Sequence, residues 1–125
     1  MVQLIDQDIQ TREVLEWKGL HLFHFLASSC SQKTRIVLNL KGVPWESHPI
    51  DLGKSEHFTP WYLGINPRGL VPTLVIDGVV HIESNDIIQL LDQKFPETKL
   101  IPEGFENQMS ELLHHEDSLH LDLRT

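Results

Sequence analysis

Residues 71–84 read VPTLVIDGVVHIES, and this stretch decides the predicted fold. Two runs rich in β-branched residues, 73–76 and 79–82, flank the pair Asp77-Gly78. An Asp-Gly pair between two such runs is a strong hairpin signal, because both positions accept the positive φ angles of a tight turn. We therefore expect an antiparallel β-hairpin here.

The chain on both sides of the hairpin continues a mixed α/β pattern. Outward from it, periodicity and stop signals predict a strand over 20–25, a helix over 29–41, an edge strand over 45–52, an irregular stretch over 53–69, a helix over 85–94 capped by Ser84, and a last helix within 103–121. A strand-helix-strand unit followed by a hairpin predicts a four-stranded mixed sheet with flanking helices.

Composition excludes several classes of function. Eighteen acidic and ten basic side chains give a formal net charge of -8, which repels phosphate backbones, so we expect no nucleic-acid partner. The single cysteine, Cys30, cannot form an internal disulfide, which is typical of a reducing cytoplasm. The sequence shows neither signal-peptide order nor an apolar run of membrane-spanning length, so we expect a cytoplasmic chain with no membrane partner.

A serine-rich turn, Ser28-Ser29-Cys30, comes directly before the helix expected over 29–41. The start of a helix offers unpaired N–H groups and a positive dipole end, and both stabilise a thiolate. A serine hydroxyl that donates to sulfur would lower the pKa of a bound thiol, whereas Cys30 at this place would itself become a reactive thiolate. The alternative is that these serines only cap the helix.

Two further features suit a peptide ligand. If the Val71-Pro72 bond were cis, the backbone of Val71 would turn outward and pair with an extended peptide; otherwise Pro72 is an ordinary trans proline at a strand start. Glu83 and Ser84 leave the hairpin at the start of a helix, where an amino-acid end group could bind through its ammonium and carboxylate. The alternative is a solvated acid beside a capping serine.

Three stretches in this order and spacing resemble the cytosolic glutathione S-transferase superfamily: SSCSQKTRIVLNLKG (28–42), NPRGLVPTLVIDG (66–78) and HIESNDIIQLLDQKFP (81–96). The Ser-Ser-Cys start is similar to the zeta class, whose pattern continues with a tryptophan and two arginines bracketing a valine. Gln32, Lys33 and Thr34 depart from that pattern, and Arg35 keeps it.

The resemblance implies a thioredoxin-like, glutathione-binding domain over 20–100, preceded by an N-terminal extension over 1–19. Residues 101–125 would be a linker and the first helix of an all-α C-terminal domain that is otherwise absent. The chain would then be an incomplete glutathione transferase that acts on a small electrophilic substrate in detoxification, isomerisation or reduction. The full-length protein would be a cytoplasmic homodimer with glutathione as cosubstrate.

The resemblance also implies roles for individual residues. Ser28, which is a cysteine in omega-like relatives, would activate the thiol; Val71 beside a cis Pro72 would contact the cysteinyl backbone; Glu83 and Ser84 would hold the γ-glutamyl end; and Lys54 and His57 are available for the glycine carboxylate. Two other functions stay open. The chain could be a binding or interaction module with little turnover, or it could exchange thiols and disulfides through Cys30.

A second cluster of polar residues lies near the C-terminus: His114, His115, Glu116, Asp117 and His120. The histidines on either side of Glu116 are five positions apart, whereas the helical two-histidine zinc motif needs four. We therefore predict a polar helix face and no metal site. The other histidines are expected to be partly exposed, so the net charge should rise below about pH 6.5.

Overall fold

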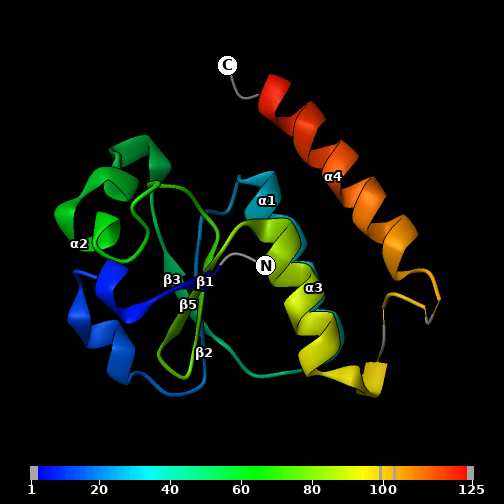
Figure 1. Ribbon diagram of the computed structural model, residues 1–125. Helices are drawn as coiled ribbons and strands as arrows, with labels where there is room; N and C mark the ends of the chain where they lie inside the picture. The colour runs from blue at the N-terminus through cyan, green and yellow to red at the C-terminus, as the bar shows by residue number, and fades with distance from the viewer. Residues whose placement is uncertain (1–2, 99, 103, 124–125) are drawn as a thin grey trace.

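A computed structural model describes residues 3–98, 100–102 and 104–123. The strands are β1 (Gln3–Leu4), β2 (Leu20–His24), β3 (Glu46–Pro49), β4 (Thr73–Ile76) and β5 (Val79–Ile82), and the α-helices are α1 (Ser29–Lys41), α2 (Pro60–Leu63), α3 (Ser84–Lys94) and α4 (Glu106–Leu123). Short 3-10 helices form at η1 (Asp6–Asp8), η2 (Arg12–Glu16), η3 (Leu52–Lys54), η4 (Glu56–Phe58) and η5 (Pro96–Thr98). Figure 1 shows their arrangement.

The strands form one mixed sheet in the order β1-β5-β4-β2-β3. β2 and β3 are parallel, and the other neighbours are antiparallel. The predicted hairpin is confirmed with the same bounds, and its turn residues Asp77 and Gly78 have φ angles of 47° and 82°. The thioredoxin-like core of β2, β3, β4 and β5 is therefore as expected, and β1 adds a fifth strand that was not predicted.

Residues before β2 pack against the domain. β1 pairs with β5, and Ile9 and Val14 are buried in the core. Thr11 occupies the N-cap position of η2 without a side-chain cap bond, and its hydroxyl donates to the carbonyl of Trp61 at 2.5 Å. Residues 3–19 are thus part of the folded unit.

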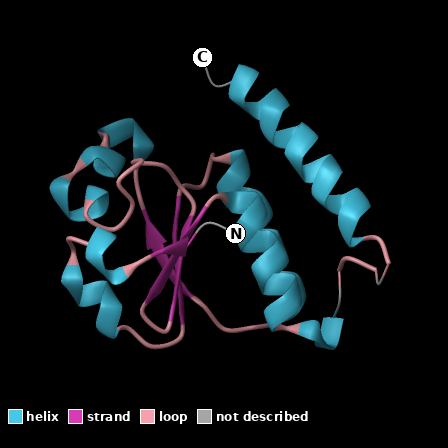
Figure 2. Cartoon of the chain, viewed as in Figure 1, coloured by secondary structure: helices cyan, strands magenta, loops and turns pink. Residues whose placement is uncertain are grey.

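Helices cover both faces of the sheet, as Figure 2 shows. Against one face, α1 and α3 bury a cluster of Leu22, Val37, Leu38, Leu74, Ile76, Ile87 and Leu91. Against the other face, the N-terminal segment and α2 bury a cluster of Ile9, Val14, Phe23, Ile50, Tyr62, Ile65, Val75, Val80 and Ile82. Alternation along β2 and β4 sends successive side chains into the two clusters, as strand geometry requires.

The ends of the helices follow from capping chemistry. α1 begins after the N-cap Ser28 and ends at Gly42, whose φ of 68° closes the helix in the left-handed conformation that glycine adopts without strain. The predicted cap of α3 is wrong by one residue. Ser84 is the first helical residue, and Glu83 occupies the N-cap position with a φ of 72°.

Three histidines that were expected to be partly exposed are buried: His21, His24 and His81 are 9%, 8% and 6% exposed. Burial is the largest cause of the lowered pKa of His24, and the nearby Arg35 and His48 lower it further. Burial and Lys94 lower the pKa of His81. Because burial disfavours the charged imidazolium, His24 and His81 take up a proton at a lower pH than an ordinary histidine does.

α4 carries the histidine cluster near the C-terminus. His114 and His115 are exposed, as expected of a polar helix face, while Glu116 is half-buried and pairs with Lys33 of α1. The side chains of Asp117 and His120 lie outside the described residues. Within the described ranges, the helices are all too short or too polar to cross a membrane.

A buried ion pair joins the C-terminal ends of α1 and α3. Lys41 Nζ lies 2.7 Å from Asp92 Oδ1, and the two side chains are 0% and 1% exposed. The backbone N–H groups of Leu100 and Ile101 also donate to this carboxylate, at 2.6 and 3.0 Å. Burial disfavours the ionised form, but the hydrogen bonds from Lys41 and from the two backbone groups outweigh it and hold the pKa of Asp92 below its usual value.

We predict that Lys41→Met lowers the free energy of unfolding by about 3–5 kcal/mol, because it leaves a buried carboxylate without its cation. Lys18→Met removes an exposed lysine and should change stability by less than about 0.5 kcal/mol. Urea unfolding at pH 7 measures both. Equal stability of the two variants would contradict the role of the pair.

The lowered pKa of Asp92 also makes the free energy of unfolding depend on pH. The stability that ionised Asp92 contributes is fully present above the unfolded-state pKa of about 3.9, and it is lost as the pH falls through the lower pKa of the folded state. The free energy of unfolding of Asp92→Asn, measured by urea unfolding, should therefore fall less steeply with decreasing pH than that of the natural chain in the acid range. If the two free energies fell equally with pH, Asp92 would not be the group responsible.

Candidate functional site

Two adjoining cavities bring most of the predicted site residues together. The Ser28 pocket is lined by Ser28, Cys30, Leu52, His57, Gly69, Leu70 and Val71. The Glu83 pocket is lined by Cys30, Asn66, Leu70, Val71, Pro72, Glu83 and Ser84. Because Cys30, Leu70 and Val71 line both, the pockets meet at these residues and offer one extended site between the start of α1 and the start of α3.

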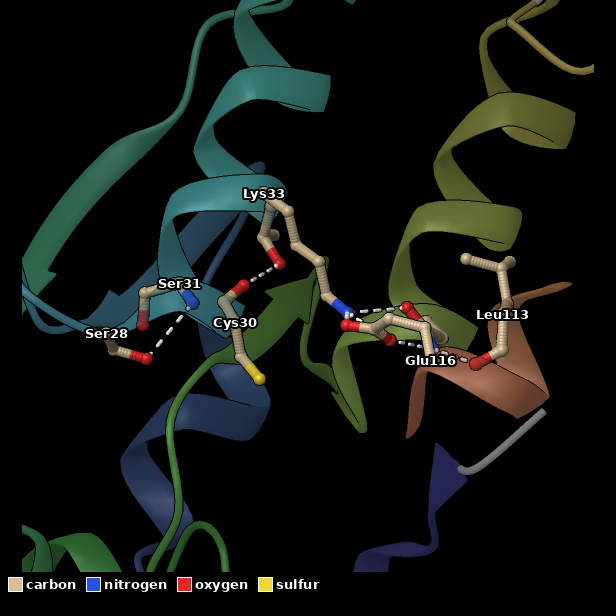
Figure 3. A network of polar contacts seen from close by, with 8 residues as sticks. Ser28, Cys30, Ser31, Lys33, Leu113 and Glu116 are labelled. Carbon is tan, nitrogen blue, oxygen red and sulfur yellow. Dashed lines mark hydrogen bonds and ion pairs between the residues drawn. The ribbon is translucent and has the colours of Figure 1, made fainter. Parts of the chain in front are cut away.

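Ser28 is the N-cap of α1. Its Oγ accepts a hydrogen bond from the backbone N–H of Ser31 at 3.2 Å (Figure 3). This bond uses a lone pair and leaves the hydroxyl hydrogen available to a ligand in the Ser28 pocket. Capping and thiol activation are therefore compatible roles for the same hydroxyl.

The two neighbours of Ser28 lie differently. Ser29 is exposed and is not among the lining residues of either pocket. Cys30 is 7% exposed, and its carbonyl accepts from the hydroxyl of Thr34 at 3.0 Å. Because Cys30 is largely buried but lines both pockets, the alternative of thiol-disulfide exchange through Cys30 requires a substrate that enters these pockets.

The Val71-Pro72 peptide bond is cis. The N–H and C=O of Val71 make no backbone hydrogen bond to the part of the chain that the structure describes, so they are available to a peptide ligand. The loop that carries Val71 is held from below by Tyr62, whose hydroxyl donates to the carbonyl of Leu70 at 2.5 Å and contacts Thr73 Oγ1 at 2.7 Å. Burial raises the pKa of Tyr62, so its hydroxyl keeps its proton.

Asn66 completes this support. Its side-chain N–H group donates to the carbonyl of Leu70 at 3.1 Å and to Thr73 Oγ1 at 3.0 Å. Its side-chain oxygen accepts the N–H of Arg68 at 3.0 Å. Asn66 is 1% exposed, so these bonds are shielded from water. Val71 is thus presented by a rigid loop.

Glu83 and Ser84 close the far end of the site. Ser84 is 6% exposed, and Glu83 forms an ion pair with Arg68. Arg68 was not among the predicted site residues, although it lies inside the NPRG stretch. The cavity here encloses only about 20 Å³, against about 190 Å³ around Ser28. A ligand ammonium would therefore have to compete with Arg68 for the carboxylate.

Lys54 and His57 were both candidates for a terminal carboxylate, and the structure separates them. Lys54 is exposed on η3 and does not line either pocket. His57 lines the Ser28 pocket, and its Nδ1 is buried without a hydrogen-bond partner among the described residues. Because His57 lines the Ser28 pocket and Lys54 does not, His57 is the better placed of the two to bind a ligand there.

A polar network ties α4 to the helix that begins at Ser28. Lys33 Nζ lies 2.9 Å from Glu116 Oε1 and 2.7 Å from Asn85 Oδ1, and Asn85 donates to the carbonyl of Leu113 at 2.9 Å (Figure 3). Lys33 therefore links α1, α3 and α4 close to the start of both pocket-lining helices. Its role could not be read from the sequence, because Glu116 is 83 positions away.

Metal-binding side chains gather elsewhere. One nitrogen of His21, one nitrogen of His48 and a carboxylate oxygen of Glu46 lie within 4.8 Å of one another. None of these residues lines the Ser28 or the Glu83 pocket. The two pockets themselves offer hydroxyl, carboxylate and backbone groups suited to a small peptide.

Comparison with known proteins gives a consistent answer. Residues 22–99 match the family model described as glutathione S-transferase, N-terminal domain. The chain is 42% identical over 93 residues to glutathione S-transferase 1 of Dianthus caryophyllus, covering 74% of this chain and 42% of that protein. It is 46% identical over 83 residues to the zeta-class glutathione S-transferase of Euphorbia esula, covering 66% of this chain and 37% of that protein.

Solved structures agree. A glutathione transferase homologue from Sulfitobacter with bound glutathione superposes with a TM-score of 0.77 at 24% identity, over 82% of this chain and 50% of that one. A maleyl pyruvate isomerase, a bacterial zeta-class glutathione S-transferase, superposes with a TM-score of 0.67 at 38% identity, over 72% of this chain and 42% of that one.

The chain thus spans about two fifths of the length of these curated relatives, and the family model covers all of the residues that line both pockets. The match of the family model, the sequence identity to named transferases and the shared fold lead to one conclusion: the chain belongs to the glutathione S-transferase family and contains its N-terminal domain.

Proposed function

We propose that the joined Ser28 and Glu83 pockets bind glutathione and lower the pKa of its thiol, for attack on an electrophile or for isomerisation. The observation that carries the proposal is the convergence of the Ser28 hydroxyl, the Val71 backbone and the Glu83 carboxylate on one site. The family binds glutathione, and one structural neighbour contains it.

Thiol activation falls to Ser28 and the start of α1. The hydroxyl hydrogen of Ser28 would donate to the sulfur, and the positive end of a 13-residue helix would favour the negative charge. Lowering the thiol's pKa raises the concentration of the nucleophilic thiolate at neutral pH. Binding also positions the sulfur for reaction.

The rest of glutathione would be held by groups on both sides of the sulfur. Val71 would pair with the cysteinyl backbone through its N–H and C=O groups. Glu83 would take the γ-glutamyl ammonium in place of Arg68, and Ser84 at the start of α3 would take the α-carboxylate. His57, which lines the Ser28 pocket, would bind the glycine carboxylate through its imidazole ring.

Further features of the whole protein are proposed from the family. The curated relatives include proteins named maleylacetoacetate isomerase and maleylpyruvate isomerase, so isomerisation is as compatible with the family as transfer to an electrophile. We propose a homodimer in the cytoplasm with a small electrophilic substrate. Glutathione binding by the chain without turnover of a standard electrophile would favour the alternative of a binding module.

We predict that Ser28→Ala raises the pKa of bound glutathione's thiol by about 1–2 units, because a hydrogen bond to a charged group contributes about 1.5–3 kcal/mol. Thiolate absorbance of the complex, followed as a function of pH, measures this shift. Loss of the cap should also lower the free energy of unfolding by about 1 kcal/mol.

Ser29→Ala is the matched control, because Ser29 is an exposed serine of the same turn. It should leave the thiol pKa unchanged. Ser28→Thr keeps a hydroxyl and should retain most of the shift. An unchanged thiol pKa in Ser28→Ala would overturn the activating role of Ser28 whatever happens to stability.

We predict that Glu83→Gln weakens glutathione binding about tenfold or more, because the ligand ammonium loses a charged partner. The diagnostic ligand is a glutathione analogue without the γ-glutamyl amine. The natural chain should bind this analogue more weakly than glutathione, and Glu83→Gln should bind the two with similar affinity. Calorimetric titration measures all four affinities.

Arg68→Gln provides the complementary test, since Arg68 competes for the same carboxylate. It should leave the discrimination between glutathione and the analogue intact. If Glu83→Gln still discriminates as strongly as the natural chain, the ammonium does not bind at Glu83.

A further inference from the structure

We propose that His21, Glu46 and His48 form a binding site for a divalent transition-metal ion of the zinc class, at the edge of the sheet formed by β2 and β3. The site is independent of the glutathione proposal, because it shares no residue with either pocket. It rests on the positions of three ligand-type side chains and on the contacts that orient them.

The sheet itself brings the three residues together. β2 and β3 pair in parallel, with His21 opposite Glu46 and Phe23 opposite His48. Because side chains alternate between the faces of a strand, Glu46 and His48 share one face, and His21 stands beside them on the neighbouring strand. The ligand atoms are held within 4.8 Å of one another by backbone geometry.

The contacts of His21 fix which of its nitrogens faces the site. Its Nε2 lies 2.8 Å from the carbonyl of Lys18, which can only accept, so neutral His21 carries its proton on Nε2. The lone pair of Nδ1 then points toward His48, whose Nε2 is 3.0 Å away. A backbone carbonyl that holds the second ring nitrogen is the arrangement that metal-binding histidines commonly have.

Aromatic side chains pack against the two histidines on the side that faces the protein core. The ring of Trp17 lies 4.7 Å from that of His21 and 5.0 Å from that of His48, and Phe23 stacks on His48 at 4.8 Å. His21 is 9% exposed, His48 is half-buried and Glu46 is exposed. The aromatic rings therefore orient the imidazoles from the protein side, and the exposed Glu46 lies where solvent, and so an ion, can reach the site.

Two imidazoles and one carboxylate suit zinc and its neighbours in the first transition series. Metal bonds of about 2.0–2.2 Å place ligand atoms of a tetrahedral ion roughly 3.3 Å apart. The two histidine nitrogens lie 3.0 Å apart, so an ion requires a small separation and a turn of the rings that aims both lone pairs at it, and rotation of the exposed Glu46 brings in its oxygen. His48 would move its proton from Nε2 to Nδ1, and water would take the fourth position.

The test is a calorimetric titration of the metal-free chain with Zn²⁺. The natural chain should bind one ion, and Glu46→Gln and His48→Asn should each weaken binding by about tenfold or more, because even the loss of an outer hydrogen-bond partner costs 10–100-fold. Both positions lie on an edge strand and are not fully buried, so these variants should fold; circular dichroism checks this.

The matched control is a double variant, His114→Asn with His115→Asn, which removes two exposed histidines of α4. It should leave the affinity for Zn²⁺ unchanged. Zinc affinity that survives in folded His48→Asn, or that falls only in the control, would overturn the proposal. His48→Asn should still bind glutathione, so failure of the metal site and failure of the proposed function are distinguishable.

Spectroscopy identifies the ligands. Co²⁺ in place of Zn²⁺ should give visible bands without a strong sulfur-to-metal charge-transfer band, because the ligands are nitrogen and oxygen. It should also quench tryptophan fluorescence, and Trp17→Phe should remove most of that quenching, since Trp17 lies against both histidines. A strong sulfur band would place the ion on Cys30 and overturn the assignment.

Discussion

The carbonyl of Leu70 is the point on which the candidate site depends. Buried groups from Tyr62 and Asn66 both donate to it, and Thr73 at the start of β4 binds the same two side chains. A buried network of this kind is rigid when it is fully satisfied and costly when one member is lost. It holds the backbone of Val71 between two helix starts, one from α1 and one from α3, so that three segments far apart in the sequence present their polar groups to one space.

Elements with a local signal could be predicted from the sequence. The hairpin at Asp77-Gly78, the helix ending at Gly42 and the helix ending before Pro96 all depend on turn and cap chemistry within a few residues, and the structure has them at or within one residue of the expected places. β1 escaped prediction because a two-residue strand has no periodicity, and only its pairing with β5 defines it. β3 is shorter than the extended run suggested, since its ladder with β2 ends at Pro49.

The candidate site likewise contains residues with a local sequence signal and residues whose roles depend on tertiary contacts. Ser28, Val71 and Glu83 lie in short motifs whose order along the chain pointed to a peptide thiol, and the structure gathers them around the joined pockets. What the sequence could not show are relations across the fold. The ion pair of Arg68 with Glu83, the orphaned nitrogen of His57 and the bridge from Lys33 to Glu116 all depend on tertiary distances. The same holds for His21 and His48, because their separation of 27 positions does not predict that the two rings meet.

The short strand β1 has a consequence for how molecules of this protein meet one another. A bare sheet edge presents unpaired N–H and C=O groups and recruits strands from neighbouring chains. Gln3 and Leu4 occupy those groups along β5, opposite His81 and Val80. At the other edge, β3 ends in Pro49, which has no N–H to offer. Pairing of β1 with β5 at one edge and Pro49 at the other thus disfavour edge-to-edge aggregation of the sheet. A fusion or cleavage that displaced residues 3 and 4 would remove this protection from the β5 edge.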